Sequence, residues 1–192
     1  MNAQPLKEIN IFPIDYLEFE RSSNLRHEYF NGEIFAMTGS SLSHNRISSN
    51  IVHGIRSKVS DSACDVFSND MRVKVDELEK YTYPDVVIVC SDIEIEKIKG
   101  METLLNPVVI FEILSDSTEE YDRGDKFTHY RFIPSLREYI LVSQKEFLVE
   151  KYLIDDKLMW NLTTYDNKED ILNIDSISCS LPLSEIYYRV EI

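Results

Sequence analysis

Two acidic residues, Asp85 and Glu112, stand where the neighbouring sequence is apolar. Asp85 directly precedes the run Val86–Val89, and Glu112 lies inside a second run over residues 108–114. Continuous apolar runs of this length are typical of strands that are buried on both faces of a sheet. A buried carboxylate without a partner is costly, so each of the two needs an opposite charge nearby. Acidic oxygens on two adjacent strands would form a site for a hard divalent cation such as Mg²⁺, with Mn²⁺ as a substitute.

A lysine in the next segment is the third candidate. The spacing of Ser117 and Glu120 matches a capping box and predicts a helix that runs to about Phe132. From Glu112 the chain extends about 10 Å as a strand before it turns, and the helix then runs about 13 Å from Ser117 to Lys126. If the helix doubles back along the strand, Lys126 lies beside Glu112. An ammonium group there would position a water nucleophile or stabilise the charge on a pentavalent phosphate.

Each of these three residues also has an ordinary structural interpretation. Asp85 follows a proline and could serve only as a turn residue. Glu112 could belong to a structural ion pair, and Lys126 could pair with Asp122 one helical turn earlier. Two acids and a lysine that converge on one place favour a catalytic site over three separate structural roles.

The elements that must position these residues predict an α/β domain. Asn31-Gly32 lies between two short alternating segments and predicts a two-residue hairpin turn. Isoleucines recur every four residues in a segment that predicts a helix over residues 43–59, packed against a sheet. Further strands are predicted over residues 64–68, 71–76, 86–89, 108–114 and 137–142, with an antiparallel hairpin over residues 147–162 and a final helical turn near residues 183–187.

Composition limits the functional classes. The chain has 192 residues and is 43% hydrophobic, which suits one folded domain and excludes global disorder. Its 20 Lys and Arg against 34 Asp and Glu give a net charge of −14. Such a surface repels nucleic acid on average, so contact with DNA requires a local basic patch or metal ions.

Cysteine use and the terminal segment bear on the compartment. The three cysteines are far apart and include no CxxC pair, which argues against a disulfide framework and a zinc–thiolate site. Cys90 ends an apolar run and is expected to be a buried free thiol. The first residues resemble no signal peptide, and no stretch reaches the roughly 18 apolar residues of a membrane span. We therefore expect a cytoplasmic protein.

Six spaced motifs together resemble a known family. They are Tyr83-Pro84-Asp85-Val86, Val109 to Thr118, Tyr121 to Tyr130, Pro134 to Tyr139, His27 to Ile34 and Ser43 to Arg46. This combination resembles the Uma-type family of putative restriction endonucleases, within the PD-(D/E)xK nuclease superfamily, over roughly residues 13–190. The resemblance implies a restriction-endonuclease-like mixed sheet flanked by helices, with added antiparallel hairpins. Residues 13–192 would form this single domain after a loose leader over residues 1–12.

The resemblance also implies roles for individual residues. Asp85 and Glu112 would be the metal-binding acids. The lysine that the superfamily places two residues after the second acid falls on Leu114 here, and in this family it moves to the following helix, as Lys126. The acid that the superfamily carries on its first helix is absent, since residues 34–60 contain no Asp or Glu.

Glu33 and His44 are the family positions that could replace that acid. Glu33 could equally be a solvated strand residue after the turn. His44 lies one turn before an apolar helix position and could equally be a core histidine whose hydrogen bonds are satisfied.

The predicted function is a Mg²⁺-dependent DNA endonuclease. Arg46, Arg56 and Lys58 lie in the acid-free stretch and are the predicted contacts to DNA, although helix-dipole compensation also explains Arg56 and Lys58. Exposed strand edges in the hairpins favour a homodimer. Two alternatives remain open: a non-catalytic dimeric module on a nuclease fold, and a hydrolase of a smaller phosphoester or nucleotide.

Overall fold

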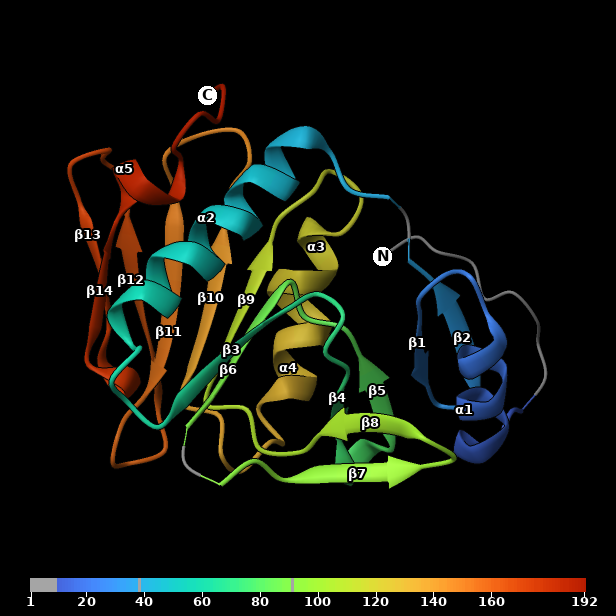
Figure 1. Ribbon diagram of the computed structural model, residues 1–192. Helices are drawn as coiled ribbons and strands as arrows, with labels where there is room; N and C mark the ends of the chain where they lie inside the picture. The colour runs from blue at the N-terminus through green and yellow to red at the C-terminus, as the bar shows by residue number, and fades with distance from the viewer. Residues whose placement is uncertain (1–9, 38, 91) are drawn as a thin grey trace.

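A computed structural model describes residues 10–37, 39–90 and 92–192, which form two large sheets with helices between and around them (Figure 1). Most of the predicted leader, residues 1–9, lies outside the described residues. Sheet A has the strand order β2-β1-β5-β4-β8-β7, and sheet B has the order β12-β11-β10-β9-β6-β3. A separate pair of strands, β13 and β14, follows near the C-terminus.

The strands of sheet A are β1 (His27–Phe30), β2 (Glu33–Ala36), β4 (Val73–Val75), β5 (Lys80–Thr82), β7 (Ile95–Ile98) and β8 (Met101–Leu104). Those of sheet B are β3 (Cys64–Ser68), β6 (Val86–Cys90), β9 (Val109–Ile113), β10 (Glu138–Val142), β11 (Val149–Ile154) and β12 (Trp160–Tyr165). The last pair is β13 (Ile171–Ile174) and β14 (Cys179–Pro182).

The helices are α1 (Pro13–Ser22), α2 (Leu42–Lys58), α3 (Glu119–Tyr121), α4 (Phe127–Tyr130) and α5 (Leu183–Ile186). A π-helical segment, η2 (Asp122–Lys126), joins α3 to α4, and two short 3₁₀ segments are η1 (Asp76–Leu78) and η3 (Asp175–Ile177). The mixed α/β architecture with flanking helices and added hairpins confirms the predicted fold class.

The central strands of sheet B, β6, β9 and β10, are buried on both faces, as their apolar runs predict. Strand β9 pairs with β10 in parallel and with β6 antiparallel. Because side chains alternate along a strand, Phe111 and Ile113 face α2, whereas Ile110 and Leu114 face α4. The α4 side is closed by strand β4 of sheet A, whose valines share its hydrophobic cluster. The segment α3–α4 therefore lies between the two sheets (Figure 1).

Sheet A begins with the predicted hairpin. Asn31 and Gly32 both have positive φ angles, 51° and 82°, as a two-residue turn requires. The sequence prediction did not include β5 or the β7–β8 hairpin, whose turn at Lys99 and Gly100 also has positive φ. These strands are three or four residues long and carry charged side chains, so they show no apolar run.

The helix after β9 differs from its prediction at the N-terminal end. It begins at Glu119, and the hydroxyl of Ser117 lies 3.1 Å from that of Ser115 instead of capping the helix. The predicted capping box is therefore wrong. A π-helical segment then interrupts the helix, and such segments widen the helical turn and occur often at functional sites.

Cys64 and Cys90 form a disulfide, so the free thiol predicted for Cys90 is wrong. The two residues lie directly opposite each other in the antiparallel pairing of β3 with β6. Spacing along the chain could not show this, because the pairing depends on strand register. Disulfides are rare in cytosolic proteins, so this bond does not favour the predicted compartment.

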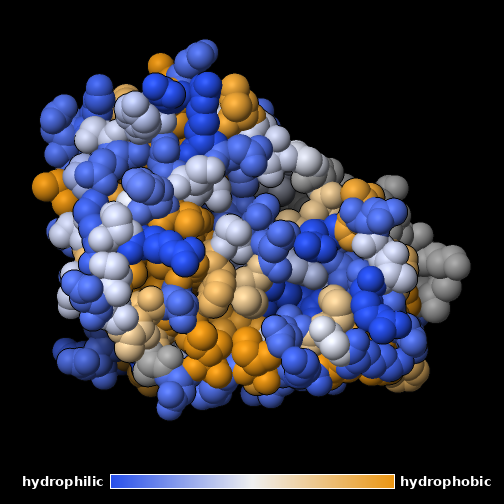
Figure 2. Space-filling view, viewed as in Figure 1, coloured by the Kyte–Doolittle hydropathy of each residue, from blue (hydrophilic) through white to orange (hydrophobic). Residues whose placement is uncertain are grey.

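The surface is mostly hydrophilic over the face that carries α2, and hydrophobic residues gather at its lower margin (Figure 2). Among the described residues, no helix is both long and apolar enough to cross a bilayer.

Replacement of Ile51 tests the packing of α2 on sheet B. Ile51 is fully buried in this interface, so Ile51→Ala is expected to lower the free energy of unfolding by about 2–5 kcal/mol in urea titrations. Arg56→Ala, on the exposed side of the same helix, is the control and should change it by less than about 0.5 kcal/mol. Equal effects of the two substitutions would contradict this packing.

Candidate active site

A cavity of about 620 Å³ opens where β6, β9 and the N-terminal end of α2 meet. The charged and titratable side chains in its wall are Glu28, His44, Tyr83, Asp85, Glu112, Asp116, Asp122, Lys126 and Lys145. Four predicted site residues, Asp85, Glu112, Lys126 and His44, are therefore in one cavity.

Strand register places the two acids side by side. Val86 of β6 lies opposite Phe111 of β9, so the next pair outward in this antiparallel ladder is Asp85 and Glu112. Both side chains point to the α4 side of sheet B, because they alternate with residues that face α2. The two carboxylates thus meet at one end of the sheet.

Both carboxylate oxygens of Asp85 have partners. The backbone N–H of Ile113 donates to Oδ2 at 2.8 Å, which ties Asp85 to the strand of Glu112. His44 Nε2 lies 3.1 Å from Oδ1. His44 is in the first turn of α2, where its backbone N–H donates to the N-cap hydroxyl of Ser41 at 3.0 Å. The Ser41 cap therefore fixes the start of α2 and with it the position of the His44 imidazole beside Asp85.

Glu112 and Lys126 form a buried ion pair. Lys126 Nζ is 2.8 Å from Glu112 Oε1, and the hydroxyl of Tyr130 donates to the same oxygen at 2.9 Å. The ammonium group also lies 3.4 Å from Asp122 Oδ1 and 3.5 Å from Glu28 Oε1. All four charged residues are at most 5% exposed, so solvent screens these interactions little.

Burial and neighbouring charges shift the pKa values of this pair. Burial raises the pKa of Glu112 well above its usual value, and the carboxylates of Asp122 and Asp85 raise it further, although Lys126 opposes them. Burial by itself would lower the pKa of Lys126, but Glu112 and Glu28 outweigh burial and raise it well above its usual value. Lys126 is therefore held as an ammonium, beside an excess of negative charge.

The structural roles that the sequence also allowed for Glu112 and Lys126 are present in the fold. Lys126 does approach Asp122, and Glu112 does form an ion pair. The partners of that pair nevertheless lie in a cavity wall and beside Asp85, which a purely structural ion pair does not require.

Glu28 is a site residue that the sequence prediction missed. It is buried on β1, and Thr82 Oγ1 donates a hydrogen bond to its Oε1. Burial opposes its ionisation, but Lys126, Lys80 and the Thr82 hydrogen bond together lower its pKa. The only signal in the sequence is a carboxylate next to Tyr29 in a short strand.

Glu33, which was predicted as a possible replacement for the missing helix acid, is not among the residues of the described cavity wall. It lies on β2 beside the hairpin turn, opposite Phe30, and its role stays a prediction. Glu28, five residues earlier on the other strand of the hairpin, has the position in the cavity.

A second buried lysine lies behind the ion cluster. Lys80 Nζ donates to the Tyr121 hydroxyl at 2.5 Å and lies 3.0 Å from His129 Nδ1. Burial lowers its pKa to about 8, and the nearby charge of Lys126 contributes in the same direction.

The residues present fit a divalent cation with few protein ligands. In the described ranges, no group of three or more His, Cys, Asp or Glu is arranged to hold a metal ion. Mg²⁺, however, keeps several waters and commonly takes one or two carboxylates together with substrate phosphates. The pair Asp85 and Glu112 supplies two carboxylates at one end of the sheet, and both line the same cavity.

None of the predicted DNA contacts is among the residues of the described cavity wall. Arg46, Arg56 and Lys58 are all on α2, which covers the face of sheet B opposite to α4. Lys58 Nζ is 2.7 Å from Glu185 Oε2, so this charge already has a partner. Contact between these residues and DNA stays a prediction.

The sequence of the chain is similar to a known protein family and to two proteins of a cyanobacterium. A family model described as Uma2, putative restriction endonuclease, matches residues 13–184. Two uncharacterized proteins of Synechocystis sp. are similar: slr1290 is 33% identical over 91% of this chain and 90% of its own length, and sll1609 is 34% identical over 78% and 84%.

A solved structure is similar as well. It is the crystal structure of a putative nuclease belonging to DUF820 from Anabaena variabilis, with a TM-score of 0.73 and 18% identity. The match covers 91% of this chain and 96% of that one, and it shows that the fold is shared. The family and the fold predicted from the sequence motifs are thus confirmed.

The lowered pKa of Lys80 predicts how stability depends on pH. Above pH 10.5 Lys80 is neutral in both the folded and the unfolded state. As the pH falls toward 8, the unfolded chain binds a proton more readily than the fold, so wild type should lose about 3 kcal/mol of stability from this group. Lys80→Met removes that loss, which urea unfolding of both proteins at pH 7.5, 9 and 10.5 would measure.

The exposed Lys97, paired with Glu102, provides the control for this comparison. Lys97→Met should keep the loss of stability that wild type shows as the pH falls from 10.5 to 7.5. Parallel profiles for wild type and Lys80→Met would contradict the shift.

Proposed function

Because the chain belongs to the Uma2 family of putative restriction endonucleases, we propose that it is a metal-dependent endonuclease that hydrolyses phosphodiester bonds in DNA. The single observation that carries this proposal is the convergence of Asp85, Glu112 and Lys126 in one cavity wall. Paired acids and a buried ammonium are the groups that phosphodiester hydrolysis needs.

Asp85 and Glu112 would hold Mg²⁺ or Mn²⁺ through their carboxylates. The cation would lower the pKa of a coordinated water and offset the charge of the phosphate. The backbone N–H of Ile113 already binds Asp85 Oδ2, which keeps this carboxylate aligned with the strand of Glu112. His44 sits against the other oxygen and supports the same orientation.

Lys126 would stabilise the negative charge that develops on the phosphate or orient the attacking water. Its ammonium group is fixed by Glu112, Glu28 and Asp122, within 2.8–3.5 Å. A cationic group that is already oriented needs no reorganisation during the reaction, which is the basis of electrostatic catalysis. Glu28 and Asp122 act as positioning residues in this proposal.

The mouth of the cavity would receive the DNA backbone. Hydroxyl groups of Ser115, Ser117 and Thr118 line it, and Lys145 lies at the same mouth, paired with Asp116 at 2.5 Å. Hydroxyls and a lysine are common partners of phosphate oxygens. At a net charge of −14, binding should be weak, sensitive to salt and stronger with Mg²⁺.

The proposal includes a homodimer that works in the cytoplasm, where DNA is accessible. Each chain has one candidate active site, and a double-strand break needs two hydrolysed bonds. A two-fold dimer presents two such sites to a duplex.

Cleavage of supercoiled plasmid and of single- and double-stranded oligonucleotides, with Mg²⁺, Mn²⁺ or EDTA, tests the function. We expect cleavage with either metal and none with EDTA. Asp85→Asn and Glu112→Gln should abolish cleavage and the heat of Mn²⁺ binding in calorimetry. Lys126→Met should keep Mn²⁺ binding but lower kcat about 10²–10³-fold, because it removes the positive charge that stabilises the phosphate in the transition state.

Lys97→Met, at an exposed residue that is not part of the cavity wall, is the matched control and should cleave as wild type does. Mn²⁺ binding without cleavage of any DNA would reject catalysis and favour a non-catalytic module. Hydrolysis of nucleotides but not of DNA would instead assign the site to a smaller phosphoester.

A further inference from the structure

The outer strand of sheet B, β12, has an unusually open edge. It has six residues, Trp-Asn-Leu-Thr-Thr-Tyr, with no charge and no proline. Leu162 at its centre is 51% exposed. Soluble proteins usually protect such edges with charged residues, prolines, bulges or very short strands, because a free edge pairs readily with another strand.

The other outer strands of the two large sheets do have such protection. Strand β2 is four residues long and contains Glu33, and β7 is equally short and contains Glu96 and Lys97. Strand β3 carries Asp65. Strand β12 is therefore the longest of these four edges and the one without a charge.

Backbone hydrogen bonds show which groups of β12 face outward. The N–H of Asp155 donates to the carbonyl of Met159 at 2.9 Å, so this pair is hydrogen-bonded within the β11–β12 hairpin. Hydrogen-bonded and non-hydrogen-bonded pairs alternate along an antiparallel ladder. The backbone N–H and C=O groups of Trp160, Leu162 and Thr164 consequently point away from β11, toward the open edge.

The same three residues share one face of the sheet. Trp160 packs against Phe127 of α4, with ring centroids 5.3 Å apart, and alternation places Leu162 and Thr164 on that side too. In a joined sheet, paired residues of the two β12 strands must point to the same face. Since side chains alternate along a strand, an even-numbered residue must then pair with an even-numbered residue of the partner. A two-fold axis at Leu162 satisfies this condition and places Trp160 opposite the partner's Thr164.

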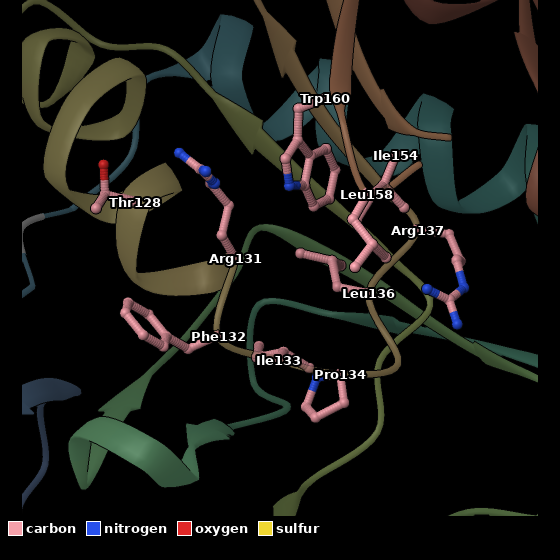
Figure 3. Close-up of a pocket in the computed structure, with 10 residues that line it drawn as sticks. All are labelled: Thr128, Arg131, Phe132, Ile133, Pro134, Leu136, Arg137, Ile154, Leu158 and Trp160. Atoms are coloured by element: carbon pink, nitrogen blue, oxygen red, sulfur yellow. The ribbon is translucent and has the colours of Figure 1, made fainter. Parts of the chain in front are cut away.

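A groove beside this edge offers a complementary surface. It has a volume of about 440 Å³, with Leu136, Ile133 and Pro134 as its floor and Arg131 and Arg137 on either side (Figure 3). Neither guanidinium group forms an ion pair within the described residues. The adjacent Leu158 and Met159 are 74% and 61% exposed, so apolar area extends from the groove to the start of β12.

We propose that β12 is the homodimer interface: two copies pair their β12 edges antiparallel around Leu162 and join their sheets into one. The pairing gives reciprocal backbone hydrogen bonds at residues 160, 162 and 164. In this register the exposed Leu158 lies level with the partner's Asp166, which brings the partner's acidic 166–170 turn to the two arginines. The interface refines the dimer of the proposed function, but its geometry does not depend on catalysis.

Light scattering and sedimentation of the whole chain over a concentration series test the interface. Wild type is expected at twice the 22.5 kDa chain mass. Leu162→Pro removes the central outward N–H from each copy and should give a monomer, since proline is tolerated on an edge strand whose N–H faces solvent. Leu162→Lys places two like charges at the axis and should also give a monomer.

Leu25→Lys is the control, because Leu25 is 60% exposed and lies outside sheet B. This variant should remain a dimer, and circular dichroism should show all variants folded. Arg131→Ala with Arg137→Ala should raise the dimer dissociation constant about tenfold through loss of complementary charge.

Three results would overturn the proposal. They are a monomeric wild type at every concentration, a Leu162→Lys protein that stays dimeric, and arginine variants that weaken DNA binding while the dimer is unchanged. The last result would assign the groove to nucleic acid. A dimeric protein that cleaves no DNA would reject the endonuclease and keep the interface, so the two proposals fail separately.

Discussion

The buried ammonium group of Lys126 is the interaction on which the rest of the site depends. Its three carboxylate partners come from separate segments: Glu112 from β9, Glu28 from β1 and Asp122 from η2. A buried charge that loses its partner costs several kcal/mol, so these segments are held together. The ion cluster therefore joins sheet A to sheet B, and the same cluster carries the charges that a phosphodiesterase needs.

The helix between the sheets satisfies this constraint through its irregular shape. A regular helix that started at the predicted capping box would reach Lys126 without the wide π turn of η2. The π-helical segment contains both Asp122 and Lys126 and buries both side chains on the side of Glu112. The helix therefore departs from regular α-helical geometry where it carries the charged residues of the site, and π-helical segments are frequent at functional sites.

Much of the fold was predictable because its signals are local. The apolar runs around Glu112 and after Asp85 indicated the buried strands of sheet B, and Asn31-Gly32 indicated the β1–β2 hairpin of sheet A. The strands β5, β7 and β8 were missed because they are short and mixed in polarity, so pairing with neighbours, and not their own sequence, makes them strands.

The sequence alone determined that Asp85 and Glu112 interrupt apolar strands and that Lys126 follows at a distance from which it can return to them. Alternation and helical rise are properties of neighbouring residues, so they can be deduced from the chain. The position of Glu28 in the cavity wall, in place of Glu33, and the bond between Cys64 and Cys90 follow from how the distant strands pair in the fold. Both outcomes depend on the register of strands that are distant in sequence, and a shift of one residue would reverse which side chains face each other.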